Sequence, residues 1–327
     1  MKAESGKRGD SSFIPHPSSF AKWPHRFAVL TALCTIPLLF VGGLVTTKGA
    51  GLAVPDWPTT FGYNPFLYPW SMMVGNIFYE HSHRLAAAAV GLLTVALAVS
   101  LWLGEKESWL RGLGAASLAL VIAQGVVGGL RVVLLEQTLA IVHACLAQAF
   151  FALAVSLALF TSDGWRENSP KLDVPDAGRL QSLCLVTTGM IYVQVVFGAV
   201  LRHLGGMLAI HLIFAFVVAA HVILLGTRVF KRHSERRELL RPLSLLSGLL
   251  LAQLALGLAA YMGKFVMALP DMLAITVRTS HVVVGALMLA TSLVLTLRSF
   301  KLFSRRSLTQ ERALGMSAAR RSGEISA

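Results

Sequence analysis

Charged residues are scarce in this sequence: they form 14% of its 327 residues, whereas a soluble domain carries roughly 25%. This composition excludes an ordinary soluble protein. Cysteine is scarce too, and all three cysteines lie inside apolar runs, which excludes a disulfide framework in the loops. The first 22 residues are polar and lack the apolar core of a cleaved signal peptide. We therefore expect the first apolar run to remain as a membrane anchor.

Long apolar runs dominate the rest of the chain. Hydrophobic residues form 55% of it, and its mean hydropathy is +0.67. A membrane-spanning helix needs about 20 mainly apolar residues, and no run shows the alternating pattern of a β-barrel strand. The sequence therefore predicts an all-α polytopic membrane protein. Its eight expected spans are residues 27–45, 85–103, 113–130, 139–160, 183–201, 205–226, 243–262 and 273–297.

The positive charges lie mainly on one side of these spans. With the N-terminus placed inside, all but six of the 29 Lys and Arg residues fall in inner segments, so the positive-inside rule puts both termini in the cytoplasm. We expect a bacterial cytoplasmic membrane, where the net charge of +13 serves contacts with anionic lipid and not with nucleic acid. The exceptions on the outer side are Lys48, Arg84, Arg131, Arg202, Lys264 and Arg278.

The spans repeat as helical hairpins. Three odd-numbered spans carry a glutamine and, four residues later, a glycine: Gln124 and Gly128, Gln194 and Gly198, Gln253 and Gly257. The first span has Gly42 at the matching depth, and each even-numbered span has a histidine near its outer end. Four hairpins predict two four-helix bundles related by a pseudo-two-fold axis. The expected parts are an inner tail at 1–26, bundles at 27–161 and 179–298, a linker at 162–178, and a basic inner tail at 299–327.

Four histidines occupy equivalent positions in the hairpins. They are His83 and His143 in the first bundle, and His211 and His281 in the second. Two imidazoles from two helices can ligate a haem iron from both sides, which predicts one haem site in each bundle. His81 is two residues from His83, about 200° around a helix, so it faces elsewhere. Zinc is a weaker interpretation, because Glu80 is the one further acidic or cysteine ligand beside either pair.

Two other features of the bundles have more than one explanation. The glycines of the odd-numbered spans either let helices pack closely or leave room for a flat macrocycle, and the two explanations are compatible. Four outer arginines, one in each hairpin, could pair with haem propionates or reach the lipid headgroups. These arginines are Arg84, Arg131, Arg202 and Arg278.

The loop after the first span carries a family resemblance. Residues 49–62 read GAGLAVPDWPTTFG, and residues 80–84 read EHSHR. Together with the four histidines, these motifs resemble the haem A synthase family of cytochrome oxidase assembly proteins over about residues 27–297. The resemblance implies that the C8 methyl group of haem O is oxidised to a formyl group. It also implies that haem O synthase delivers the substrate, which binds in the N-terminal bundle, and that haem b in the C-terminal bundle passes electrons.

The resemblance assigns roles to individual residues. The substrate-haem histidines fall on His83 and His143, at the level of Arg84 and Arg131, and the haem b histidines fall on His211 and His281, at the level of Arg202 and Arg278. Glu80 matches the glutamate of the family, and we expect it to act as a catalytic base; an ion pair with Arg84 is the alternative. The outer loops lack the paired cysteines of some bacterial members, so no redox role of such a pair transfers here.

Two other functions would use the same residues. A b-type electron-transfer cytochrome would need the four histidines without chemistry on the porphyrin, and a transporter would use them as a proton relay. Ligation by two histidines leaves no open position on the iron. Direct oxygen activation would therefore require one histidine to dissociate, whereas water attack after stepwise electron removal would not. The sequence leaves this choice open, together with the electron partner and a possible homo-oligomer.

Overall fold

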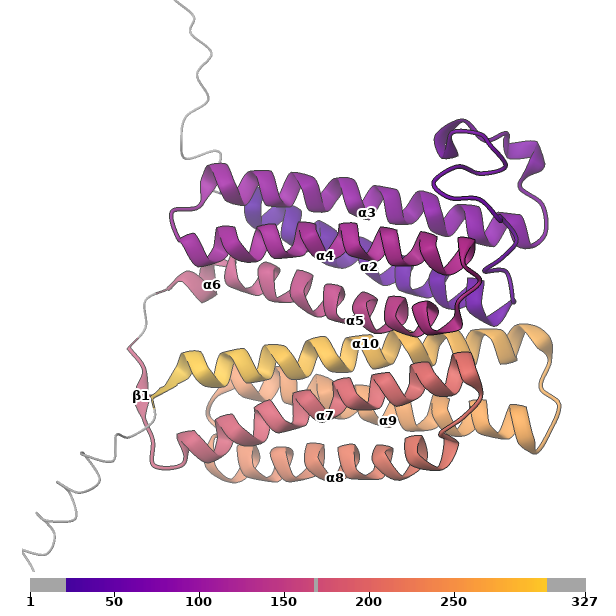
Figure 1. Ribbon diagram of the computed structural model, residues 1–327. Helices are drawn as coiled ribbons and strands as arrows, with labels where there is room; N and C mark the ends of the chain where they lie inside the picture. Colours follow the sequence, from indigo (N-terminus) through magenta and orange to yellow (C-terminus); the bar gives the residue numbers. More distant parts are fainter. Residues whose placement is uncertain (1–21, 168–169, 305–327) are drawn as a thin grey trace, which may run out of the picture.

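The computed structural model describes residues 22–167 and 170–304, and within them eight helices are long and apolar enough to cross a membrane (Figure 1). They are α2 (Trp23–Thr47), α3 (Asn76–Gly104), α4 (Ser108–Val133), α5 (Gln137–Phe160), α7 (Ala177–Leu204), α8 (Leu208–Arg232), α9 (Arg237–Phe265) and α10 (Asp271–Leu302). This confirms the prediction of an all-α, multi-pass membrane protein.

The helix ends differ from the expected spans at a few places. The sixth span begins at Leu208 and not at residue 205, because Gly205 ends α7 in the left-handed conformation, with φ of 75°, which glycine adopts at little cost. At the chain ends, α2 already begins at Trp23 and α10 continues to Leu302. Residues 1–21 and 305–327, most of the two predicted inner tails, lie outside the described residues.

The eight helices form two groups of four. Helices α2 to α5 contact one another in sequence order, and α2 also contacts α5; α7 to α10 do the same in the second group (Figure 1). The groups meet through α2 against α10, α5 against α7 and α5 against α10. If the first group is exchanged for the second, α2 takes the place of α7 and α5 takes the place of α10. The contact of α2 with α10 then becomes the contact of α5 with α7, and the contact of α5 with α10 is unchanged, as the predicted two-fold relation requires. The relation itself stays a prediction.

Apolar side chains cover the outside of both groups. Leu103 and Phe216 are 79% and 73% exposed, and a surface of this kind suits contact with lipid. Inside the second group, Leu225, Leu243 and Leu295 are fully buried in the largest apolar cluster. Because lipid offers the helices no hydrophobic reason to associate, close packing and polar contacts between helices must hold the two groups together.

The two ends of the molecule are built differently. At one end, β1 (Leu172–Asp173) pairs in parallel with β2 (Phe303–Ser304), which holds the last described residue, and the chain enters α2 at the same end of the molecule. The short helix α6 (Asp163–Arg166) and β1 lie in the predicted linker. At the other end, residues 48–75 form a long loop with two short 3₁₀ helices, η1 (Pro65–Leu67) and η2 (Trp70–Met72) (Figure 1). This loop lies over the first group of helices.

Candidate functional site: two histidine pairs and an ordered loop

The structure brings the four repeated histidines together in two pairs. His83 of α3 faces His143 of α5, with ring centroids 6.5 Å apart and an interplanar angle of 85°. His211 of α8 faces His281 of α10, with centroids 6.4 Å apart and an angle of 67°. All four lie in the first half of their helices, so both pairs lie towards the end that carries the long loop (Figure 1). Each bundle therefore contains one histidine pair.

A glycine on the neighbouring helix makes room for each imidazole ring. A Cβ atom at Gly42 would lie 2.9 Å from Cε1 of His83, and one at Gly128 would lie 2.7 Å from Cε1 of His143. The corresponding distances are 3.2 Å at Gly198, opposite His211, and 3.2 Å at Gly257, opposite His281. These contacts give the close-packing explanation a specific form: the glycines let a helix backbone approach the Cε1 atom of an imidazole.

The glutamines of the repeat bond to three of the histidines. Gln124 donates from Nε2 to the backbone oxygen of His143 over 2.9 Å, and its own backbone oxygen lies 3.1 Å from Nδ1 of that histidine. Gln194 donates to the backbone oxygen of His211 over 2.9 Å. In the fourth hairpin, Nε2 of Gln253 lies 3.3 Å from Nε2 of His281. Sequence reasoning found these glutamines as marks of the repeat but missed their contacts with the histidines.

The donor set of each pair fits a haem. Two imidazole nitrogens held about 2 Å from a shared metal ion on opposite sides put their ring centres about 6 Å apart, which is close to the separation of both pairs. Among residues 22–167 and 170–304, no group of three His, Cys, Asp or Glu side chains could hold a bare metal ion. A metal with only two protein ligands must bring its remaining ligands, and the porphyrin of a haem supplies four nitrogens in its plane. The buried histidine pairs therefore suit this group.

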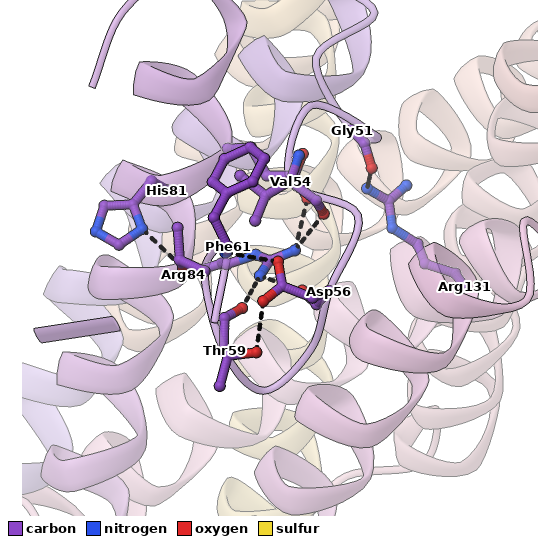
Figure 2. Close-up of polar contacts among 10 residues, drawn as sticks. Gly51, Val54, Asp56, Thr59, Phe61, His81, Arg84 and Arg131 are labelled. Atoms are coloured by element: carbon purple, nitrogen blue, oxygen red, sulfur yellow. Dashed lines mark hydrogen bonds and ion pairs between the residues drawn. The ribbon is translucent and has the colours of Figure 1, made fainter. Parts of the chain in front are cut away.

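Glu80 and Arg84 hold the long loop in place, and Figure 2 shows Arg84 beside Val54, Asp56 and Thr59 of that loop. Arg84 donates to the backbone oxygens of Asp56, Thr59 and Val54 over 2.7, 2.9 and 2.9 Å. It also pairs with Oε1 of Glu80 over 2.9 Å, while Oε2 of Glu80 accepts the backbone N–H of Val54 over 2.9 Å. Glu80 is only 3% exposed. Both of its oxygens are thus engaged, and the ion pair considered from the sequence is present.

Asp56 closes the tip of the same loop. Its carboxylate accepts hydrogen bonds from the Thr59 hydroxyl and from the backbone N–H groups of Phe61 and Gly62. Burial of the carboxyl raises the pKa of Asp56, but these hydrogen bonds outweigh burial and lower the pKa to about 2. The bonds favour the charged form, so the loop tip depends on an ionised Asp56.

His81 serves the loop and not the histidine pair. Its Nδ1 lies 3.1 Å from the hydroxyl of Thr60, and its ring packs 5.0 Å from that of Tyr68. The side chain is 1% exposed. As their spacing on the helix predicts, the two side chains face different surroundings: His81 faces the loop, and His83 faces His143.

Three of the outer arginines contact the protein backbone. Arg84 binds the loop as described, and Nη2 of Arg131 donates to the backbone oxygen of Gly51 over 3.2 Å (Figure 2). Arg202 of α7 reaches across to the first bundle, where it donates to the backbone oxygen of Gly43 over 2.7 Å and to the Thr47 hydroxyl over 2.6 Å. Its Nη1 also lies 3.5 Å from the backbone oxygen of Arg278. Propionate binding by these arginines stays a prediction.

Trp57 connects the loop to α4. A Cβ atom at Gly129 of α4 would lie 2.1 Å from the Trp57 ring, so the indole lies directly on the helix backbone. Gly129 follows Gly128, which packs on His143. The loop and the first histidine pair therefore contact adjacent residues of one helix.

The fold and the two histidine pairs define an integral membrane protein with a two-histidine site in each of two four-helix bundles. The family model described as cytochrome oxidase assembly protein (COX15-CtaA) matches residues 25–210, more than half of the chain. The chain belongs to this family. The matched residues include His83 and His143 but end one residue before His211.

Two curated relatives are both named heme A synthase. The protein of Shouchella clausii (strain KSM-K16) is 29% identical over 190 residues, which cover 56% of this chain and 60% of the relative. The protein of Bacillus pumilus (strain SAFR-032) is 27% identical over 190 residues, which cover 56% of this chain and 59% of the relative. The chain therefore spans about three fifths of the length of these relatives.

Proposed function

We propose that this protein is a haem A synthase, a membrane oxidoreductase that converts the C8 methyl group of haem O to a formyl group for cytochrome oxidase assembly. The observation that carries the proposal is the pair of facing imidazoles in each bundle, with ring centroids 6.5 and 6.4 Å apart, in a chain of this family. The names of the two relatives support the same activity.

The first bundle is the proposed substrate site. His83 and His143 would hold haem O, and the ordered loop would cover that site and limit the access of water. Arg84 and Arg131 stand at the base of the loop, where a propionate could exchange for one of their backbone contacts. The loop supports this assignment because oxidation of a substrate needs a site that opens for loading and closes for chemistry.

The second bundle is the proposed electron-transfer site. His211 and His281 would hold haem b, with Arg202 and Arg278 at the same level; a bound haem b supplies one-electron chemistry. Arg202 bonds to Gly43, the neighbour of the glycine that packs on His83. This contact links the two sites through two adjacent residues of α2.

Glu80 is the proposed proton acceptor. Oxidation of a methyl group to a formyl group releases protons, and a carboxylate is a suitable acceptor. Because both oxygens of Glu80 are engaged with Val54 and Arg84, this role requires that one contact open during the reaction. Glu80→Gln should keep the Val54 contact and lower the yield of haem A by about 100-fold while haem O stays bound. If instead the loop becomes sensitive to protease and haem O is lost, Glu80 acts by holding the loop.

The membrane setting and partners follow from the same proposal. We propose a bacterial cytoplasmic membrane with both termini in the cytoplasm and the histidine pairs towards the outer side, because the Lys and Arg residues concentrate at the opposite end. Haem O synthase would deliver the substrate, an electron partner would reoxidise haem b, and the protein could form a homo-oligomer.

A b-type electron-transfer cytochrome is the competing function, since it would use the same four histidines. Co-expression with a source of haem O, followed by pigment extraction and mass analysis, separates the two. Haem A and its hydroxylated precursor are expected in the extract, and they should be missing when His143→Ala replaces the native chain. Recovery of haem B and unmodified haem O alone would refute the synthase assignment.

A further inference from the structure

The long loop over the first bundle carries an exposed apolar surface. Residues 57–79, here called the aromatic segment, contain no Asp, Glu, Lys or Arg. From the middle of this segment onwards, large apolar side chains are exposed: Phe66, Leu67, Trp70, Met72, Val74 and Phe78. Trp70 is 79% exposed, as much as Leu103 on the outside of α3. An exposed apolar surface of this kind marks an interaction site.

The other side of the aromatic segment is packed against the protein. Tyr68 and Met73 are buried, and the ring of Tyr68 lies 5.0 Å from that of His81 on α3. The short helix η1 also contacts α3. The exposed side chains therefore stand on a segment that the helix holds in place, and their exposure is a fixed feature of the fold.

The aromatic segment lies at the level of a headgroup layer. Helix α3 has 29 residues, which make it about 43 Å long, and a bilayer with its headgroups is about 40–45 Å thick. The first residues of α3, from Asn76, therefore reach the headgroups at this end of the molecule. Because η1 contacts α3 and the loop projects beside the first turns of that helix, away from the second bundle (Figure 1), the segment extends over the surrounding lipid.

The exposed surface continues into the lipid-facing side of α3. Phe78, Leu92 and Val99 are all exposed and are spaced by multiples of seven residues, so they share one face of the helix. Leu92 and Val99 lie within the apolar run that crosses the membrane. The surface of the loop and the lipid contact of the helix are therefore one continuous apolar face.

The residue types of the segment favour lipid over a protein partner. Tryptophan and tyrosine are enriched at both membrane–water interfaces, and the exposed Trp102 lies at the opposite end of α3 from Trp70. A binding site for a soluble domain normally has a polar rim around its apolar centre. The aromatic segment offers no charged side chain for such a rim.

We propose that the aromatic segment is an interfacial membrane anchor, which places Phe66, Leu67 and Trp70 in the headgroup layer beside the first bundle. The partner is the lipid surface itself. Glu80 and Arg84 hold the loop from the side of the protein, and lipid holds it from the other side. Opening of the loop over the first histidine pair therefore has to withdraw apolar side chains from lipid, which is unfavourable.

Fluorescence quenching of Trp70 tests the anchor in nanodiscs that hold one copy of the full chain. The difference in emission between the native chain and Trp70→Phe isolates the signal of Trp70. Lipids brominated near the headgroup should quench this signal as much as that of Trp102, obtained in the same way from Trp102→Phe, and iodide in the water should quench it less than free tryptophan. Quenching by iodide to the level of free tryptophan, or no quenching by the brominated lipid, would overturn the proposal.

A charged substitution provides a second test that does not depend on Trp70→Phe. Leu67→Glu puts a charge at the proposed lipid contact, and we expect protease cleavage within the aromatic segment to become about 10-fold faster in nanodiscs, because a large apolar side chain no longer holds the segment in lipid. Leu67→Met, which stays apolar, is the matched control and should be cleaved like the native chain. Equal cleavage of the two variants would refute the anchor. Neither test uses haem, so both are independent of the synthase activity.

Discussion

The two bundles contain nearly the same histidine pair beneath different coverings. Ring separations differ by only a tenth of an ångström, at 6.5 and 6.4 Å, and each ring packs on a glycine. Over the first pair lies the loop of residues 48–75, held by Glu80, Arg84 and Asp56, whereas residues 205–207 and 266–270 make short connections at the same end of the second bundle. A repeated scaffold thus supplies the histidine pairs, and the loop distinguishes one site from the other.

Removing a ligand should separate the two sites most strongly. His143→Ala leaves the first pair with one imidazole, and we expect the yield of haem A to fall by at least about 100-fold while the second haem remains. His281→Ala should instead remove haem b and leave haem O bound but unconverted. Haem content per protein and extracted pigment mass measure both effects. Loss of both haems from either variant would contradict independent sites.

Breaking the loop contacts should affect the first site alone. Arg84→Gln removes the partner of a buried carboxylate, which typically costs about 3 kcal/mol or more, and releases three backbone contacts. We expect rapid protease cleavage within residues 48–75 and loss of haem A production, with haem b retained. Lys106→Gln, which removes an exposed positive charge at the opposite end of α3, serves as the control. Unchanged protection of the loop would rule out its dependence on Arg84.

Filling a glycine contact should have a smaller, graded effect. Gly128→Ala places a Cβ atom 2.7 Å from His143, whereas Gly198→Ala places one 3.2 Å from His211. Overpacking typically costs about 1–3 kcal/mol, so Gly128→Ala should weaken haem binding more than Gly198→Ala does. Gly125→Ala, on the same helix with open space around its Cβ position, is the matched control. The comparison fails if all three variants retain haem equally in a detergent titration.

Acid should have the smallest effect of these changes, and it should loosen only the loop over the first site. The folded pKa of Asp56 is about 2, below the ordinary value of 3.8, so its ionised form stabilises the loop above that ordinary value, and this contribution is lost as the pH falls through about 2. Pepsin cleavage within residues 48–75 should therefore increase between about pH 4 and pH 2. Asp56→Asn should be cleaved at a rate that hardly changes over this interval, and a native-like pH profile in this variant would exclude Asp56 as the cause.

Much of the fold could be predicted because membrane insertion imposes strong local rules. Runs of apolar residues located the eight spans, and they missed mainly helix ends such as the start of α8, where a left-handed glycine decides the boundary. Repeat spacing also grouped the histidines correctly in space: His83 lies with His143, and His211 lies with His281. Their haem ligation remains a prediction to be measured.

The sequence alone determined the spans, the repeated hairpins and the residues at their mouths, because helix length and periodicity depend on neighbours in the chain. Only the tertiary structure decided that Glu80 and Arg84 bind a loop 26 to 30 residues away in the chain and that Arg202 bonds to the other bundle. It also decided that Nδ1 of His143 lies by the backbone oxygen of Gln124, whereas Nδ1 of His83 has no hydrogen-bond partner among the described residues. Hydrogen bonds depend on distance and direction between atoms, and these are set by how the helices pack.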